Sequence, residues 1–234
     1  GVDYKPIFDR QGSYSIGCVS IDPKNPNVVW VGTGENNNQR SVAYGDGVYK
    51  SVDGGASWKN MGLKSSEHIG NILIHPENSD IVYVSAYGPL WNKGGDRGIY
   101  KTTDGGKSWN KILFIDEHTG FNEIHMDPRN PDVLYATSHQ RRRHVYTYVG
   151  GGPGSGIHKS VNGGNTWRKI NKGLPGVEIG RIGMDISDAN PEVIYAIVEA
   201  SERKGGFYKS TNRGESWQKQ SSKVTSGNYY QEIF

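Results

Sequence analysis

The chain has 234 residues, 33 of them glycine, and its 27 basic and 24 acidic residues leave a net charge of +3. This near balance argues against binding to nucleic acid or to an anionic membrane, because proteins that do so gather an excess of positive charge. The single cysteine, Cys18, excludes an internal disulfide and a cysteine-based metal cluster. No apolar run approaches the roughly 18 residues that a membrane-spanning helix requires.

A phrase built around Asn and Pro recurs along the chain, at residues 22–31, 75–84, 127–136 and 187–196. The first copy reads DPKNPNVVWV, in which Pro and Asn indicate a turn and the β-branched and aromatic residues that follow indicate a strand. Apolar segments before these turns predict a further strand at 16–21, 69–74, 121–126 and 179–186. No segment has the sustained helical period and caps of a helix.

A second motif, with the pattern S/T-x-D/N-x-G-x-S/T-W, also occurs four times. The copies read SVDGGASW at 51–58, TTDGGKSW at 102–109, SVNGGNTW at 160–167 and STNRGESW at 210–217. Glycine tolerates the positive φ of a tight turn, and Asp or Asn can accept hydrogen bonds from nearby backbone N–H groups. We interpret the motif as a structural corner, not a catalytic site, because Asn replaces Asp twice. Its key residues are Asp53, Trp58, Asp104, Trp109, Asn162, Trp167, Asn212 and Trp217.

Each repeat of about 50 residues therefore holds four short strands. Strands A and B flank the Asn-Pro turn, strand C ends in the corner motif, and strand D begins at its Trp. This pattern predicts an all-β fold, a β-propeller of four-stranded antiparallel blades. A stacked β-solenoid is the alternative, although its repeats are shorter. We place four complete blades at 9–62, 63–115, 116–174 and 175–222, all in a single propeller domain.

The two ends of the sequence resemble parts of further repeats. Gly1 to Tyr4 matches the end of a corner motif, which predicts strand D of a preceding blade over residues 1–8. Residues 223–234 are predicted to form strand A of a following blade. We therefore expect an internal piece of a larger propeller protein, with the remaining blades of the parent chain as its partners.

Most candidate site residues lie in the long, variable connections between strands B and C, at 34–47, 86–98, 138–156 and 199–205, while Glu178 lies in a D–A connection. Such loops on a rigid scaffold usually carry binding. Inverting glycoside hydrolysis needs two carboxylates about 6.5–9.5 Å apart, and the candidates are Glu35, Glu178 and Glu199. The alternative is that these are ordinary loop charges. Candidate ligand contacts are Asn36, Arg40, Tyr44, Tyr87, Trp91, His139, Arg141 and Arg143.

The run Arg141–Arg143 could bind a carboxylate or sulfate, or could be a solvated charge run. His139 and His144 lack a recognisable metal-ligand spacing, so we expect neither a metal site nor a cofactor. The glycine-rich residues 150–156 precede a predicted strand and not a helix, so they do not form a phosphate loop.

The corner motifs are identified as Asp boxes, also called BNR repeats. The chain as a whole resembles large bacterial Asp-box proteins of the sortilin type, often labelled glycosyl hydrolases. The matching stretches include VGTGEN at 31–36, GDGVYKS at 45–51, GGPGSG at 151–156, GRIG at 180–183 and YY at 229–230. This resemblance implies an exported parent protein with blades on both sides. Xyloglucanases and sialidases share Asp boxes, but the sialidase Arg-Ile-Pro signature is absent and the catalytic aspartates of xyloglucanases have no match.

From these features we expect an exported interaction module that presents its B–C loops to a polypeptide or a glycan. The first alternative is a xyloglucanase-like glycoside hydrolase that uses the loop carboxylates. The second is a propeller with a purely structural role in a secreted or cell-surface assembly.

Overall fold

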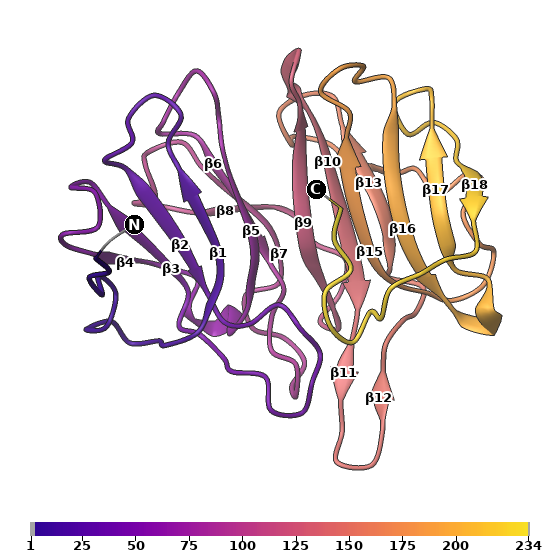
Figure 1. The fold of residues 1–234 in the computed structure, drawn as a ribbon, viewed down its shortest axis with the longest axis horizontal. Coiled ribbons are helices and arrows are strands. Elements are labelled where there is room, and N and C mark those ends of the chain that lie inside the picture. Colours follow the sequence, from indigo (N-terminus) through magenta and orange to yellow (C-terminus); the bar gives the residue numbers. More distant parts are fainter. Residues whose placement is uncertain (1–2, 234) are drawn as a thin grey trace.

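The computed structural model describes residues 3–233, which form four antiparallel sheets of four strands each (Figure 1). The first sheet comprises β1 (Ile16–Ile21), β2 (Val29–Thr33), β3 (Val48–Ser51) and β4 (Lys59–Gly62). The second comprises β5 (Ile69–Ile74), β6 (Val82–Ala86), β7 (Gly98–Thr102) and β8 (Asn110–Leu113). The third comprises β9 (Thr119–Asp127), β10 (Asn130–Gln140), β13 (Gly156–Ser160) and β14 (Arg168–Lys169). The fourth comprises β15 (Ile179–Ile186), β16 (Ile194–Ala200), β17 (Gly206–Ser210) and β18 (Gln218–Ser221).

Three small elements complete the described structure. A two-stranded hairpin, β11 (Arg142–Arg143) and β12 (Tyr148–Val149), projects from the connection between β10 and β13. Two three-residue 3₁₀ turns, η1 (Lys64–Ser66) and η2 (Ser201–Arg203), lie in loops. In each sheet the strands pair in chain order, as the predicted A, B, C and D strands require. The all-β propeller-blade architecture is therefore confirmed.

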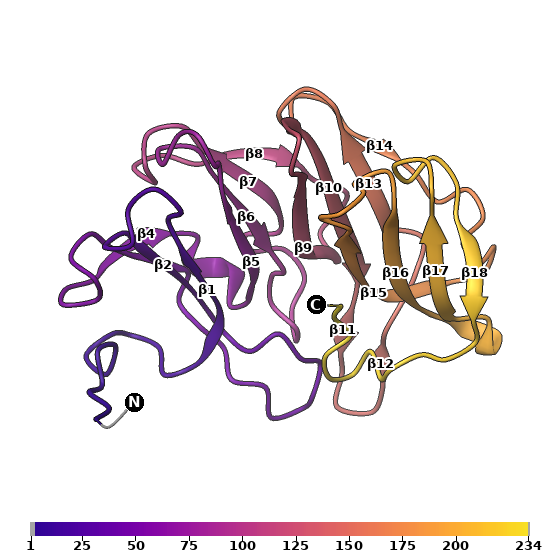
Figure 2. The same ribbon diagram turned by 45° about the horizontal axis from the view of Figure 1, so that its top comes forward.

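The sheets follow one another in chain order, and the innermost strands β1, β5, β9 and β15 are successive neighbours (Figures 1 and 2). Three hydrophobic clusters fill the spaces between consecutive sheets. The first joins Trp30 and Val48 to Val82 and Tyr100. The others join the second sheet to the third and the third to the fourth. Because every sheet is covered by a neighbour, central strands such as β6 and β13 are buried along their whole length.

All four corner motifs have the same hydrogen bonds. In the first, the Ser51 hydroxyl donates to Asp53 Oδ1 at 2.8 Å and accepts from the Gly55 N–H at 2.8 Å. Asp53 also accepts from the backbone N–H and the hydroxyl of Ser57, at 2.8 and 2.6 Å. In the third, Asn162 accepts from the Thr166 N–H at 2.9 Å, and its amide nitrogen donates to the Thr166 hydroxyl at 2.8 Å. The amide thus replaces the carboxylate without loss of a bond.

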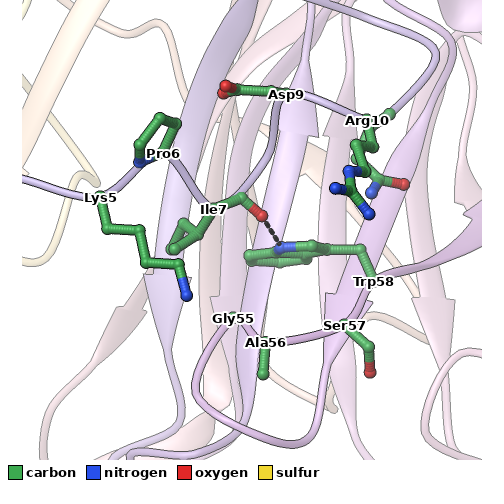
Figure 3. A pocket seen from close by; sticks show the side chains of 10 residues that line it. Lys5, Pro6, Ile7, Asp9, Arg10, Gly55, Ala56, Ser57 and Trp58 are labelled. Atoms are coloured by element: carbon green, nitrogen blue, oxygen red, sulfur yellow. Dashed lines mark hydrogen bonds between the residues drawn. The ribbon is translucent and has the colours of Figure 1, made fainter.

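Two of the four corner tryptophans, Trp109 and Trp217, connect consecutive sheets. Trp109 Nε1 donates to the Met61 carbonyl oxygen at 2.8 Å, and Trp217 Nε1 donates to that of Ile170 at 2.8 Å. Trp58 Nε1 makes the matching bond, at 2.7 Å, to the Ile7 carbonyl oxygen (Figure 3). A cavity of about 410 Å³ lies between this corner and residues 5–11. This cavity is therefore a gap in the packing between the first corner and residues 5–11.

The strands predicted at the two ends of the sequence are not formed in the described residues. No strand is present over residues 3–8 or 223–233, while residues 1, 2 and 234 lie outside the described part. The reason is that a strand is held by ladder hydrogen bonds to a sheet partner, and neither described segment has one within the chain. Ile7 nevertheless occupies the position of Met61, and Gln231 lies against Gly183 of β15, as a neighbouring innermost strand would.

Candidate functional site

The connections between strands B and C and between D and A lie at the same end of the sheets, because neighbouring strands are antiparallel. We call this end the loop face. It includes the β11–β12 hairpin, which projects downward in Figure 1. Four exposed aromatic residues, Tyr44, Trp91, Phe114 and Tyr146, lie in these connections. Three more, Tyr14, Tyr229 and Tyr230, lie in the segments that lead into β1 and out of β18 at the same end of the sheets. Elsewhere in residues 3–233 the only exposed aromatic side chain is that of Tyr4.

Asn38 is the centre of contacts among the loops of this face, although it is fully buried. Its backbone N–H donates to the Asn228 carbonyl oxygen at 2.9 Å, and its Nδ2 donates to that of Gly227 at 2.7 Å. Its Oδ1 accepts from Arg141 Nη1 at 2.5 Å, and its backbone oxygen accepts from Arg143 Nε at 2.7 Å. Asn38 therefore links the first B–C loop to the third B–C loop and to the C-terminal segment.

The predicted ligand contacts Arg141 and Arg143 serve this internal network. Arg141 is fully buried, and its guanidinium stacks on the Tyr87 ring at 3.3 Å from the centroid. Its nitrogens also donate to the carbonyl oxygens of Asn37 and Gly88, at 3.2 and 3.3 Å. Arg143 is half-buried and lies 4.6 Å from the Tyr148 ring centroid. The arginine run is therefore not a solvated charge run, because two of its members hold loops together.

Tyr87 and His139, two further predicted ligand contacts, are also buried. The Tyr87 hydroxyl makes a short hydrogen bond to His139 Nδ1, and His139 Nε2 lies 3.1 Å from the Gly150 carbonyl oxygen. Burial, reinforced by the positive charge of Arg141, lowers the pKa of His139 to about 3. His139 is therefore neutral at physiological pH and supports the loop at Gly150.

The candidate Glu35 shapes its own loop. Its Oε2 accepts a hydrogen bond from the Ala43 N–H at 2.8 Å, across the first B–C loop. Asn36 is buried beside it, and Asn36 Nδ2 donates to the carbonyl oxygens of Gly17 and Gly70. Arg40 and Tyr44 lie exposed at the tip of the same loop, and Trp91 is exposed on the second B–C loop.

Glu178 and Glu199, the other two carboxylate candidates, line one pocket of about 300 Å³ together with Tyr148. We call it the carboxylate pocket. Burial raises the pKa of Glu199, whose Oε2 accepts a hydrogen bond from the Arg181 N–H at 3.3 Å. Glu178 is exposed. The structure therefore brings two of the three predicted carboxylates together and leaves Glu35 in a different loop.

Sequence reasoning missed the roles of Asn38 and Arg181. Arg181 is 1% exposed, and its Nη1 donates to the carbonyl oxygens of Asn36 and Tyr229. The only signal in the sequence was its place in the stretch GRIG at 180–183, which says nothing about partners 48 or 145 positions away.

A family profile described as Sortilin-Vps10 (sortilin, neurotensin receptor 3) matches residues 46–152. The chain resembles the sortilin-type β-propellers. A curated relative is the xyloglucanase of Hypocrea jecorina, which is 26% identical over 192 residues, covering 73% of this chain and 22% of the relative. The GH74 enzyme of Niastella koreensis has the same fold, with a TM-score of 0.64 and 19% identity over 87% of this chain and 29% of that enzyme.

A further structural neighbour of this chain is YCF48 from Cyanidioschyzon merolae, with a TM-score of 0.53 and 18% identity over 92% of this chain and 59% of that protein. The chain thus spans less than a third of the Hypocrea and Niastella proteins. Across residues 3–233, no helix has the length and apolar character needed to cross a bilayer.

Proposed function

We propose that this segment is an interaction module whose loop face binds a glycan chain. The observation that carries the proposal is that seven of the eight exposed Phe, Tyr and Trp side chains among residues 3–233 lie at that end of the sheets. An aromatic ring buries a large apolar area at small conformational cost, and exposed groups of such rings mark interaction surfaces. Flat aromatic rings can stack on the faces of pyranose sugars. Arg40, which lies with Tyr44 at the tip of the first B–C loop, can donate hydrogen bonds to sugar hydroxyl groups.

A glycan is favoured over a polypeptide because the Hypocrea jecorina relative is a xyloglucanase. A polysaccharide of this kind lies outside the cell, so the proposal includes export of the protein. The remaining blades of a larger parent chain are its proposed structural partners. Binding of peptides instead of glycans would indicate a polypeptide ligand. Binding of neither would indicate a purely architectural role.

The test is calorimetric titration of the chain with xyloglucan oligosaccharides, with cello-oligosaccharides and unrelated peptides in parallel. Replacing Tyr44 or Trp91 with Ala should weaken glycan binding about tenfold. The reason is that the stacking of a flat ligand ring on an aromatic side chain contributes on the order of 1–3 kcal/mol. Tyr4→Ala is the matched control, because Tyr4 is exposed but belongs to no loop-face connection. Equal affinity in all three variants, or binding of peptides alone, would contradict the proposal.

The carboxylate pocket favours glycoside hydrolysis as the second candidate function. A general acid needs a raised pKa, which burial gives to Glu199, while a second carboxylate, that of Glu178, lines the same pocket. In this scheme Glu199 donates a proton to the leaving oxygen and Glu178 activates water. The test is the release of reducing ends from xyloglucan. This candidate is favoured over binding alone if the release disappears in both Glu199→Gln and Glu178→Gln while oligosaccharide binding is retained.

A further inference from the structure

A pocket of about 310 Å³ lies beside the β11–β12 hairpin, and we call it the hairpin pocket. Its lining comes from the hairpin, from the end of β10 and from the connection between β8 and β9. The lining residues are His118, Gln140, Arg141, Arg142, His144 and Val149. None of them lines the carboxylate pocket, and no aspartate or glutamate of the described residues lines the hairpin pocket.

Arg142 is set apart from the other arginines of the run by the register of the hairpin. It pairs with Val149 across the hairpin, and the next pair is Arg143 with Tyr148. Directly opposite residues of an antiparallel pair lie on the same face, whereas successive residues lie on opposite faces. Arg143 lies on the face of Tyr148, where its Nε donates to the Asn38 carbonyl oxygen at 2.7 Å. Arg142 lies on the opposite face with Val149, and both line the hairpin pocket.

Arg142 has no partner within the described residues. The side chain is half-buried, yet no hydrogen bond, ion pair or aromatic ring among residues 3–233 engages its guanidinium. Its Nε is enclosed without an acceptor, whereas its two Nη groups, also without one, remain accessible. A guanidinium has five N–H donors and no acceptor, so one that meets no protein oxygen depends on water or a ligand.

Gln140 adds a second free donor to the hairpin pocket. Its Oε1 accepts a hydrogen bond from the Gly154 N–H at 3.0 Å, which fixes the orientation of the amide because a backbone N–H needs an acceptor. The Nε2 group at the other end has no acceptor among residues 3–233 and remains accessible. The imidazoles of His118 and His144 can supply further N–H groups. Free donors therefore dominate the polar lining of this pocket.

The hairpin pocket also lies in a region of unneutralised positive charge. Arg97 and Arg141 are fully buried, and both donate only to uncharged oxygens. Burial, together with the charges of Arg141 and Arg142, lowers the pKa of Arg97 to about 10, although Asp116 and Glu67 oppose this effect. An anion beside Arg142 would offset the mutual repulsion of these guanidinium groups.

We propose that the hairpin pocket binds a sulfate group. A sulfate has negative charge and only acceptor oxygens, which match a lining of accessible donors without a carboxylate. A hydrogen phosphate carries a donor of its own, for which no carboxylate lines the pocket.

The sulfate group comes from a free sulfate ion or from a sulfate ester on a sugar. For the ester, Tyr146 offers a flat ring beside the pocket, because it stacks on His144 with 5.6 Å between the ring centroids and is 84% exposed. Only the ester source rests on the proposed glycan function.

The experiment is an NMR titration of the ¹⁵N-labelled chain with sodium sulfate, with sodium chloride adjusted to keep the ionic strength constant. Saturable shifts of the Gln140 side-chain amide are expected. Arg142→Gln should weaken sulfate binding at least about tenfold, which corresponds to the loss of one charge-assisted hydrogen bond. Arg203→Gln is the matched control, because it removes an exposed arginine outside the pocket and should leave binding unchanged. Sodium acetate and sodium phosphate should bind more weakly than sulfate.

Titrations with glucose 6-sulfate and with glucose distinguish the two sources. Tighter binding of the sugar sulfate than of inorganic sulfate, with the difference lost in Tyr146→Ala, assigns the ester. Equal binding of the two sulfates assigns the free ion. Either result supports the sulfate site, whereas the glycan function is decided separately by the titration with neutral oligosaccharides.

Thermal unfolding of each variant verifies that the fold is retained. If Arg142→Gln does not fold, His118→Ala replaces it, because His118 is exposed and its imidazole makes no hydrogen bond within residues 3–233. The proposal is overturned if the shifts rise without saturation, or if the variant that folds binds sulfate as tightly as the wild type. It is also overturned if Arg203→Gln weakens binding equally, or if acetate or phosphate binds as tightly as sulfate.

Discussion

The indole nitrogen of Trp109 donates a hydrogen bond of 2.8 Å to the carbonyl oxygen of Met61, at the edge of the preceding sheet. The Trp109 ring also packs edge-on against Trp30, which is fully buried between the same two sheets. The corner motif therefore does more than turn the chain, because its last residue joins one sheet to the next.

Replacing Trp109 with Phe should lower the free energy of unfolding by at least about 1 kcal/mol, because the bond to Met61 is lost and the smaller ring packs less against the core. Urea denaturation measures the change. The control is Trp91→Phe, because Trp91 is partly exposed on the loop face and the structure shows no hydrogen bond from its indole. An equal loss of stability in both variants would mean that the bond to Met61 contributes nothing.

Replacing Asp53 with Asn should leave stability at pH 7 almost unchanged, whereas Asp53→Ala should lower it. The reason is that Asn162 and Asn212 already make the same bonds in the third and fourth corners. Hydrogen bonds from Ser57 and Ser51 lower the pKa of Asp53 to about 2. The folded carboxylate thus stabilises the protein above the unfolded pKa of about 3.9, and this contribution is lost as the pH falls toward 2. Thermal unfolding from pH 5 to pH 2 should therefore show a larger loss of stability in the wild type than in Asp53→Asn.

Acidification should also destabilise the protein through its buried histidines. Burial lowers the pKa of His68 and of His139 to about 3, whereas an unfolded histidine takes up a proton near pH 6.5. Below pH 6.5 the unfolded state therefore binds more protons, and stability falls by at most about 1.4 kcal/mol per pH unit for each histidine until about pH 3. His139→Gln, which can keep a partner for Tyr87, should show a shallower fall between pH 7 and pH 5 in urea titrations. Identical slopes would refute the assignment.

Gly70→Ala should destabilise the fold by roughly 1–3 kcal/mol or more, because a Cβ at Gly70 would overlap the backbone of Asn122 on the next innermost strand. Gly176→Ala is the matched control, since a Cβ there meets no atom within 4 Å. This control should be neutral or stabilising by about 0.4–1 kcal/mol. Chemical denaturation of both variants checks the prediction, which fails if Gly70→Ala is as stable as the control.

The regular part of the fold could be predicted from the sequence because the repeat sets it locally. The strands predicted at 16–21, 69–74 and 179–186 coincide with β1, β5 and β15, and the strand at 121–126 is extended in β9. Each is a short apolar run ended by a turn that contains Pro and Asn, and the corner motif fixes the other end of the sheet. Such signals lie within about 50 residues of one another, so no distant contact is needed to read them.

The loop face was harder to predict because its geometry depends on contacts between distant residues. Arg141 and Asn38 are 103 positions apart, and their hydrogen bond decides that Arg141 points inward. Nothing in the run Arg141–Arg143 distinguishes a guanidinium that meets solvent from one that meets a buried carbonyl. The inward orientation of Tyr87 and His139 likewise depends on contacts between distant residues. Glu178 and Glu199 are closer in sequence and line one pocket. Their catalytic roles stay predictions.

The third corner departs from the other three, because Trp167 Nε1 donates to Gly164 of its own turn, at 3.0 Å, and not to the preceding sheet. The joint between β7–β8 and β13–β14 therefore lacks the crosslink that Trp109 and Trp217 give to the joints on either side. Under a stretching force along the arc, separation should begin at this joint, and a single-molecule pulling trace should record the two halves, residues 9–113 and 119–221, as successive events.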